Sequence, residues 1–458
     1  MKRKLFSIFF AISLLISSSL ALFSCSISGS SGISDAQINE NGELIIVYQD
    51  GTTQNLGVVV GKDGSDGKDG KDGQDGKDGM DGKDGTNTSG DSVIISKEEN
   101  NITLASAIGL RSAVSITCNF KATVQQGGWR PGSGSTTIKE YSSAGSGVIY
   151  KLDKSEGDAF IITNYHVVYD SSSNTENGIS DDISVYLYGS ETNEKAIKAV
   201  YVGGSLYYDV AVLHVDNSEI IKNSDASAVA VTNSDQITVG NDAIAIGNAQ
   251  GLGISTSVGI VSVDSEYITM TAADGKSEVS FRVMRVDTAI NSGNSGGGLY
   301  DGQGRLIGIV NAKIVDDGVE NIGYAIPSNV AVSIAENIID YCYGTSTESV
   351  QRALLGITVT ASDSKAVYNE ENGTIRIEET VSVYEVNEGS LSYGVLESGD
   401  IFVSATLAGK TIEITRQYHI IDIMLDVRVG DTISITVIRN GEQITLSLTI
   451  TEDCLSSY

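Results

Sequence analysis

A serine held between glycines, in the run Gly293-Asn294-Ser295-Gly296-Gly297, is the part of this sequence best suited to chemistry. Glycine adopts backbone conformations that other residues avoid, so the run can form a tight turn. Such a turn leaves backbone N–H groups free to point at a bound carbonyl oxygen beside the serine hydroxyl. The run therefore predicts an acyl-transfer site with Ser295 as nucleophile.

The residues that follow Ser295 separate two unrelated kinds of serine hydrolase. In an α/β-hydrolase, a helix follows the serine, and the acid and the histidine come later in the chain. Here more glycine and then Asp301-Gly302 follow, which disfavours a helix. The only later histidine, His419, lies in what we interpret as another domain. The α/β-hydrolase arrangement is therefore disfavoured.

Two candidate partners of Ser295 precede it in the chain. His166 follows the apolar run 159–163, and Asp209 precedes the apolar run 210–215. Alone, either residue is typical of an ordinary strand end or turn. Together, the order His, Asp, Ser is that of chymotrypsin-like double barrels, in which histidine takes the serine proton and aspartate orients histidine. We expect His166, Asp209 and Ser295 to form a catalytic triad.

Short apolar runs separated by turn residues fill the chain around these three residues, and they predict an all-β barrel or sandwich. The predicted strands are Ala113–Thr117, Gly145–Tyr150, Ala159–Thr163, Val185–Tyr188, Ala199–Val202, Val210–Val215, Ala243–Ile246, Val258–Val263, Val279–Val286 and Leu306–Val310. Residues 125–143 are rich in Gly and Ser and predict a loop. Residues 330–341, apolar on one face, predict the one convincing helix of this region.

The final part of the chain predicts a separate α+β unit. An amphipathic stretch at 416–426 predicts a helix. The alternating runs 432–438 and 443–450 flank Asn440-Gly441, which is a strong hairpin signal.

Several motifs resemble those of the HtrA/Deg family of trypsin-like serine proteases, over roughly residues 100–450. They are Gly145-Ser146-Gly147-Val148, Thr163-Asn164-Tyr165-His166-Val167-Val168, Asp209-Val210-Ala211-Val212-Leu213, the run from Asp287 to Gly297, Gly308-Ile309 and Gly323-Tyr324-Ala325-Ile326-Pro327-Ser328. The resemblance implies a mostly β fold, in which a chymotrypsin-like double β-barrel precedes a PDZ-like α+β domain. It implies His166 as general base, Asp209 as its orienting group and Ser295 as nucleophile.

The resemblance also places the parts that bind substrate. The N–H groups of Gly293 and Ser295, with Asn294 between them, would form the oxyanion hole. The pocket for the residue before the cut would be walled by two segments and would favour small aliphatic side chains. These segments are Ile290, Asn291 and Ser292, and Val310, Asn311, Ala312 and Lys313; Lys313 is unusual at its position.

The last unit is similar to a PDZ domain, which binds an extended chain as an added strand and captures its C-terminus with backbone N–H groups. The loop Leu354-Leu355-Gly356-Ile357 matches the loop that receives the peptide carboxylate. Residues 398–402 and 429–431 match two later landmarks, whereas residues 358–390 fit less well.

The N-terminus reads as a secretory leader. Residues 2–4 are basic and an apolar run reaches Leu22 before Cys25, which resembles a bacterial lipobox with Cys25 lipidated. An ordinary signal peptide or an uncleaved anchor helix is the alternative. The other cysteines, Cys118, Cys342 and Cys454, are odd in number and form no CxxC pair, so we expect neither a disulfide framework nor zinc. A bridge between Cys118 and Cys342 is left open.

Two segments separate the leader from the barrels. Residues 43–48 and 52–56 flank Asp50-Gly51 and predict a hairpin, which needs a further partner for stability. From Gly61 to Gly85, every third residue is glycine, the repeat of a collagen triple helix. A solvated spacer of up to ~75 Å is the alternative for this proline-free stretch.

These signals divide the chain and set its expected function. The divisions are 1–24 signal peptide, 25–60 tether with hairpin, 61–90 stalk and linker, 91–345 protease and 346–458 PDZ-like domain. The net charge of −29 argues against nucleic-acid binding. We expect an ATP-independent endoprotease without cofactor or metal, lipid-anchored on the outer face of a bacterial membrane, that cleaves unfolded or damaged polypeptides and binds peptide C-termini. The family resemblance implies a homotrimer. A regulatory protease of one envelope substrate, or a chaperone or adhesin that keeps the fold, are the alternatives.

Overall fold

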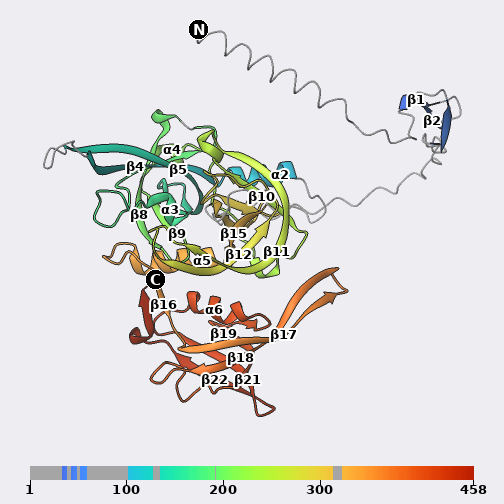
Figure 1. The fold of residues 1–458 in the computed structure, drawn as a ribbon. Coiled ribbons are helices and arrows are strands. Elements are labelled where there is room, and N and C mark those ends of the chain that lie inside the picture. Colours follow the sequence, from blue (N-terminus) through green and yellow to red (C-terminus); the bar gives the residue numbers. More distant parts are fainter. Residues whose placement is uncertain are drawn as a thin grey trace, which may run out of the picture. The chain divides into compact units, whose positions relative to one another are not determined.

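The structure is a computed structural model that describes residues 33–38, 43–48, 52–58, 102–126, 135–190, 192–312 and 322–457 (Figure 1). The predictions for the leader, Cys25, the Gly-X-Y repeat and Lys313 lie outside the described residues. The chain divides into two compact units, residues 1–89 and 90–458. Each unit is treated by itself below.

The first unit contains a three-stranded antiparallel sheet in the order β1-β2-β3, formed by Ile33–Ile38, Glu43–Tyr48 and Thr53–Val58. Strands β2 and β3 are the predicted hairpin, which is confirmed. Strand β1 supplies the extra partner that a lone hairpin needs, because it pairs along β2 from Ile38↔Leu44 to Ile33↔Tyr48.

The second unit begins with helix α2 (Ile102–Leu110) and a six-stranded closed barrel in the order β4-β5-β6-β9-β8-β7. Its strands are β4 (Ala113–Gln126), β5 (Ser135–Asp153), β6 (Asp158–Thr163), β7 (Asp182–Leu187), β8 (Ile197–Ser205) and β9 (Val210–Val215). Alternate residues fill the barrel: in β7, Ile183, Val185 and Leu187 are buried and their neighbours are partly exposed. The short helices α3 (Tyr165–Val168) and α4 (Glu219–Lys222) and the 3₁₀ turn Asn193–Lys195 lie in its connections.

A second closed barrel follows in the order β10-β11-β12-β15-β14-β13. Its strands are β10 (Asp242–Gly247), β11 (Ser255–Thr271), β12 (Glu278–Val286), β13 (Gly298–Tyr300), β14 (Leu306–Val310) and β15 (Gly323–Pro327), with 3₁₀ turns at Ser234–Gln236 and Ala249–Gly251. Helix α5 (Ser328–Cys342) follows and confirms the predicted helix. Two successive closed barrels confirm the predicted mostly β, double-barrel fold.

One local prediction was wrong, and one helix was missed. Residues 135–143, expected in a loop, continue β5, which pairs with β4 from Ala113↔Val148 to Gln126↔Ser135. Their Ser residues suggested a loop, but Thr136, Thr137 and Ile138 are good strand formers. Helix α2 was not predicted, since it lacks a clear apolar period. Its Gly109 is buried, and a Cβ there would press on Ile246 and Tyr300, so packing selects this helix.

The C-terminal part carries a sheet in the order β17-β18-β19-β21-β22, with β20 beside β19, and one helix, α6. The elements are β16 (Gln351–Ala353), β17 (Ile357–Asn369), β18 (Thr374–Val386), β19 (Ile401–Leu407), β20 (Lys410–Glu413), α6 (Gln417–Asp426), β21 (Thr432–Arg439), β22 (Glu442–Thr449), the 3₁₀ turn Glu452–Cys454 and β23 (Leu455–Ser457). The turn Asn440-Gly441 has φ of 55° and 84°, as a tight hairpin requires, so this hairpin is confirmed. Helix α6 packs on α5 (Figure 1).

Cys118, Cys342 and Cys454 are free thiols, so the alternative of a Cys118–Cys342 bridge is wrong. Burial of its side chain raises the pKa of Cys118 to about 12, which keeps the thiol protonated. Among the described residues, no helix is both long enough and apolar enough to cross a membrane.

Candidate active site

His166 and Asp209 occupy adjacent loops of the first barrel. Strand β6 ends at Thr163, and α3 starts two residues later, which places His166 directly beyond the strand. Asp209 precedes β9 with φ of 54°, a left-handed conformation that aspartate tolerates better than most residues. Its carbonyl oxygen accepts from Asn164 Nδ2 at 2.8 Å and from the backbone N–H of Tyr165 at 3.2 Å. These bonds hold the turn in that conformation.

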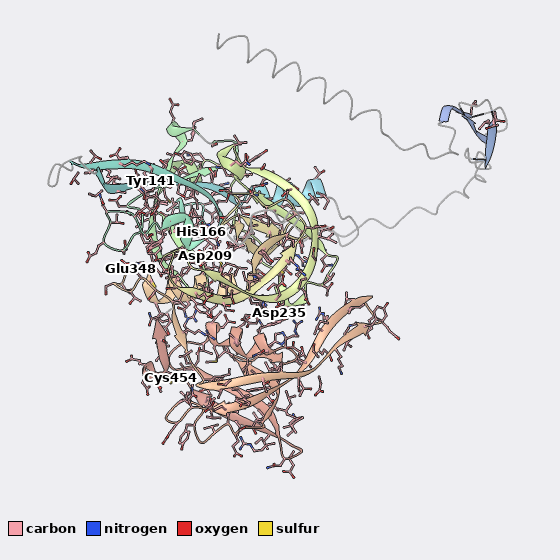
Figure 2. All side chains as sticks on the ribbon, viewed as in Figure 1. Tyr141, His166, Asp209, Asp235, Glu348 and Cys454 are labelled. Atoms are coloured by element: carbon pink, nitrogen blue, oxygen red, sulfur yellow. The ribbon has the colours of Figure 1, made fainter. Side chains whose placement is uncertain are left out.

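The side chains of His166 and Asp209 lie in contact. Figure 2 labels both residues in the same part of the second unit. His166 Nδ1 is 2.6 Å from Asp209 Oδ2, and the backbone N–H of His166 donates to Asp209 Oδ1 at 2.9 Å. The Asp209 residue is only 4% exposed, so water competes little for these bonds. The two contacts leave Nε2 of His166 as the nitrogen that faces the cleft, which is the arrangement needed for a general base.

Asn311 does not lie where the pocket prediction placed it. Its side chain is fully buried, and its Nδ2 donates to Asp209 Oδ2 at 2.8 Å. Asp209 Oδ2 therefore accepts from both His166 and Asn311. The sequence could not indicate this contact, because it joins residues from the two barrels.

Ser295 lies on the turn between β12 and β13, next to His166 across one cavity. Its Oγ accepts a long bond of 3.3 Å from the backbone N–H of Ala312. Among the described residues, no hydrogen bond joins Ser295 Oγ to His166. Such bonds are often absent before substrate binds. Rotation of Ser295 about χ1 would release Ala312 and direct Oγ to His166.

The carbonyl groups of the Ser295 turn accept hydrogen bonds from within the protein. Ser292 O accepts from the backbone N–H of Gln250 at 2.7 Å, and Asn294 O accepts from Gly297 N at 2.9 Å. Gly293, with φ of 96°, supplies the left-handed conformation that the turn needs. Within the described part of the chain, the N–H groups of Gly293 and Ser295 donate to no backbone carbonyl. They are therefore available to an oxyanion.

Ser146, on β5, joins this turn to the first barrel. Its hydroxyl donates to Gly293 O at 2.7 Å and accepts from Asn248 N at 2.8 Å, and its N–H donates to Ser295 O at 2.8 Å. The residue is fully buried. Sequence reasoning noted Gly145-Ser146-Gly147 only as a family motif. A polar residue between two glycines inside a strand was the available signal.

A cavity of about 390 Å³ opens beside Ser295. It is lined by His166, Tyr169, Asp170, Ser171, Ala273, Ser292, Ser295 and Ala312. Ser292 and Ala312 are thus at the predicted pocket. Asn291 is exposed, and Ile290 packs beside Gly323 on the core of the second barrel. The segment 169–171 and Ala273 were missed, because they come from loops that the sequence does not join.

The other two histidines lie away from this cavity. His214 Nε2 is 2.8 Å from Asp158 Oδ1, and its ring packs against Phe160 and Tyr343, so its contacts are structural. His419 lies on α6, where burial lowers its pKa to about 4. Among the described residues, no group of three or more His, Cys, Asp or Glu side chains is placed to hold a metal ion.

The predicted peptide loop 354–357 lies between β16 and β17. Gly356 has φ of 71°. The carbonyls of Leu355 and Gly356 accept from Ser392 N at 3.2 Å and Asn387 N at 2.9 Å. In the described structure, the N–H groups of these two residues have no backbone acceptor. This geometry resembles a loop that can receive a carboxylate.

Two closed barrels with a His–Asp pair and a serine on a glycine turn define a trypsin-like serine peptidase. Residues 145–309 match the family model of the trypsin-like peptidase domain. The chain is 34% identical over 313 residues to the serine protease Do-like HtrA of Bacillus subtilis, with 66% of this chain and 62% of that protein covered. It is 32% identical over 339 residues to the serine protease Do-like HtrA of Lactococcus lactis subsp. lactis, with 71% and 75% covered. The match thus spans somewhat less than two thirds of the Bacillus relative.

The chain belongs to the family of Do-like HtrA serine proteases, and it is a serine endopeptidase. This confirms the family resemblance inferred from its motifs. Among solved structures, it is similar to the HtrA-type protease AlgW with decapeptide, at 25% identity and a TM-score of 0.46, over 78% of this chain and 99% of that one.

Proposed function

We propose that the chain is an ATP-independent endoprotease that cleaves exposed segments of unfolded or damaged polypeptides through a Ser295 acyl-enzyme. His166 takes the Ser295 proton and returns it to the leaving amine, Asp209 orients His166, and the N–H groups of Gly293 and Ser295 stabilise the oxyanion. The observation that carries this proposal is the 2.6 Å His166–Asp209 contact at a cavity that Ser295 also lines.

The test is loss of chemistry at one hydroxyl. We expect Ser295→Ala to abolish casein degradation and labelling by a fluorophosphonate, because both require the nucleophile. Ser142→Ala is the control: it removes an exposed hydroxyl on β5, outside the cavity, and should keep both activities. Full casein degradation by the Ser295→Ala protein would refute the assignment. Proteome-wide mapping of cleavage sites then separates general degradation from a regulatory protease with one substrate.

We propose that the C-terminal part, residues 346–458, binds peptide C-termini as a PDZ-like domain. The unoccupied N–H groups of Leu355 and Gly356 support capture of a carboxylate, and β17 supports strand addition, since it pairs only with β18 among the described strands. We expect a peptide with a free C-terminus to bind and the same peptide with a C-terminal amide to bind much more weakly. Equal affinity for the two peptides would contradict carboxylate capture.

The tether is proposed to be a lipid on Cys25, on the outer face of a bacterial membrane, and the assembly to be a trimer. Metabolic labelling with a fatty-acid analogue should mark the protein and fail for Cys25→Ser. A molar mass measured with and without residues 61–85 tests the stalk. A trimer that forms only when residues 61–85 are present supports a triple helix. A trimer in both proteins indicates that the protease domains assemble by themselves, and a monomer in both refutes the trimer.

A further inference from the structure

The cavity beside Ser295 has one wall of distinct chemistry. Most of its lining is small and uncharged, namely Ser171, Ala273, Ser292, Ser295 and Ala312. Beyond His166, the remaining wall is made by Tyr169 and Asp170. Among the described residues that line the cavity, Asp170 is the one acidic side chain, and none is Lys or Arg. A substrate side chain that fills the cavity therefore meets an aromatic ring and a carboxylate together.

Asp170 is held in place by its own loop. Its Oδ1 accepts from the backbone N–H of Ser172 at 2.7 Å, its N–H donates to Gly178 O at 2.9 Å, and its carbonyl accepts from Ser173 N at 3.0 Å. The carboxylate is partly buried but takes part in no ion pair within the described residues. Its position is thus fixed while its charge stays unneutralised, as a recognition group requires.

The neighbouring groups strengthen the negative potential of this wall. The stacked rings of Tyr165 and Tyr169 have centroids 5.2 Å apart. Burial and then the charges of Asp274 and Asp170 raise the pKa of Tyr169, so its hydroxyl stays neutral. Asp274, at the tip of the β11–β12 hairpin, is anchored by Ser277 and by the N–H of Lys276. Lys276 is the one nearby cation on that tip, and its side chain is exposed.

We propose that Asp170 selects polypeptides with Lys or Arg within two residues of the scissile bond. The basic side chain would lie along the Tyr169 ring and place its charge on the carboxylate of Asp170, and these contacts suit both residue types. The position follows from the cavity, because Ser295 and His166 line it together with Asp170. The inference rests on the proposed role of Ser295, and it specifies a substrate preference beyond it.

The experiment compares fluorogenic peptides that are identical except for Ala or Lys at each of the two positions on either side of the cut. At one of these positions, we expect kcat/KM for the Lys peptide to exceed that for the Ala peptide by about tenfold or more. Asp170→Asn keeps the Oδ1 acceptor for Ser172 and removes only the charge. It should bring the ratio of the two kcat/KM values close to one. Asp170→Lys should reverse the preference in favour of a Glu peptide.

Three controls keep the outcome decisive. Asp181→Asn removes an exposed carboxylate outside the cavity and should leave the ratio unchanged. Asp170→Glu, which restores the charge, should recover part of the preference and shows that the loop still folds. Ser295→Ala should lose cleavage of every peptide, which separates failure of the mechanism from failure of the preference. A wild-type ratio near one at all four positions overturns the proposal, as does a preference that survives Asp170→Asn or that depends on Asp274 instead.

Discussion

Ser146 ties three parts of the site together through one side chain and one N–H group. Its hydroxyl fixes Gly293 O and Asn248 N, and its N–H fixes Ser295 O, so the peptide groups of the oxyanion turn cannot rotate freely. Gly296, with φ of 82°, lies so close that a Cβ would collide with Ser146 O. The open oxyanion turn is therefore a property of the contact between the barrels.

Ser146→Ala should lower kcat by about 10-fold to 100-fold and change KM little, because a turn that can collapse loses one oxyanion donor. The measurement is steady-state kinetics on a fluorogenic peptide. Ser142→Ala, on the exposed part of the same strand, is the control and should behave as wild type. Equal kcat values for the Ser146→Ala and wild-type proteins would show that the turn holds its shape without this hydroxyl.

Asn311 neutralises part of the charge on Asp209 with a donor that cannot itself ionise. In Asn311→Ala, this buried carboxylate loses one of its donors, which is worth about 1.5–3 kcal/mol for a charged acceptor. We expect kcat/KM to fall by about tenfold or more, with the secondary structure unchanged by circular dichroism. Asn311→Gln, if it reaches Asp209, should recover activity in part. A fully active Asn311→Ala protein would show that the backbone bonds of the turn hold Asp209 in place without Asn311.

At the scale of elements, the contact between α6 and β12 is polar at its centre. Arg282 of β12, 3% exposed, donates to Asp235 Oδ1 from both terminal nitrogens at 2.9 Å and lies 3.3 Å from Asp422 of α6. Its guanidinium carbon is 3.9 Å from the centroid of the Tyr418 ring. Burial of a charge is unfavourable unless its partners are complete, so this cluster depends on every member.

Arg282→Ala should lower the free energy of unfolding by about 3–5 kcal/mol, because the partly buried Asp235 and Asp422 then lose their buried cation. Urea denaturation followed by circular dichroism measures it. Arg285→Ala is the control. Arg285 lies on the same strand, but its ion pair with Glu266 is about a third exposed, so its loss should cost ~1 kcal/mol or less. Comparable losses for the two variants would mean that burial of the cluster is not what matters.

Two side chains of α6 should give opposite dependences of stability on pH. Burial raises the pKa of Asp422 from 3.8 to about 6, against the charge of Arg282, and burial lowers that of His419 from 6.5 to about 4. Between pH 4 and 6, the folded state thus holds one more proton at Asp422 and one fewer at His419 than the unfolded state. Since the slope follows the difference in bound protons, the two effects nearly cancel.

Removing either side chain should expose the other effect. In His419→Gln, Asp422 acts alone, and stability should fall as pH rises from 4 to 6, by up to ~1.4 kcal/mol per unit. In Asp422→Asn, His419 acts alone, and stability should rise from pH 4 to 6.5. Denaturation midpoints at pH 4.5 and 6 measure the slope for each variant and for wild type. The charged groups around this interface, Asp235, Arg416, Lys410 and Asp426, are the same in all three proteins, so differences in slope report the substituted side chain. Parallel slopes in the two variants would contradict this account.

At the scale of the whole molecule, most strands could be predicted, but contacts between them could not. Runs such as 210–215 are apolar and β-branched, which specifies a buried strand locally. The length of β5 could not be predicted, because its outer half is stabilised by pairing with β4 rather than by burial. His166, Asp209 and Ser295 were found from residue type and order. Asn311, Ser146 and Asp170 were not assigned their contacts, since these depend on how the barrels and loops pack.

The segment that leads into the C-terminal part is hydrogen-bonded to the first barrel close to Asp209. Glu348 O accepts from Gly204 N at 2.9 Å, and Arg352 Nη1 donates to the Tyr208 hydroxyl at 2.8 Å. Tyr208 is 5% exposed and directly precedes Asp209, whose left-handed backbone carries strain of about 1–3 kcal/mol. The loop 354–357 begins two residues after Arg352. The C-terminal part is thus hydrogen-bonded to Tyr208, which lies in the turn that holds Asp209 against His166.

Arg352→Ala should therefore lower kcat for a short peptide substrate about tenfold with KM little changed, because Asp209 is held less firmly while the cavity beside Ser295 is intact. Arg376→Ala is the matched control. It also removes an arginine of the C-terminal part that donates to a carbonyl outside that part, Gln236 O, at 3.2 Å. Gln236 is far along the chain from Asp209. A loss of stability alone would affect both variants alike. If both variants lose kcat equally, or if neither does, Arg352 does not act through Tyr208, and the C-terminal part is joined to the barrels without influence on the triad.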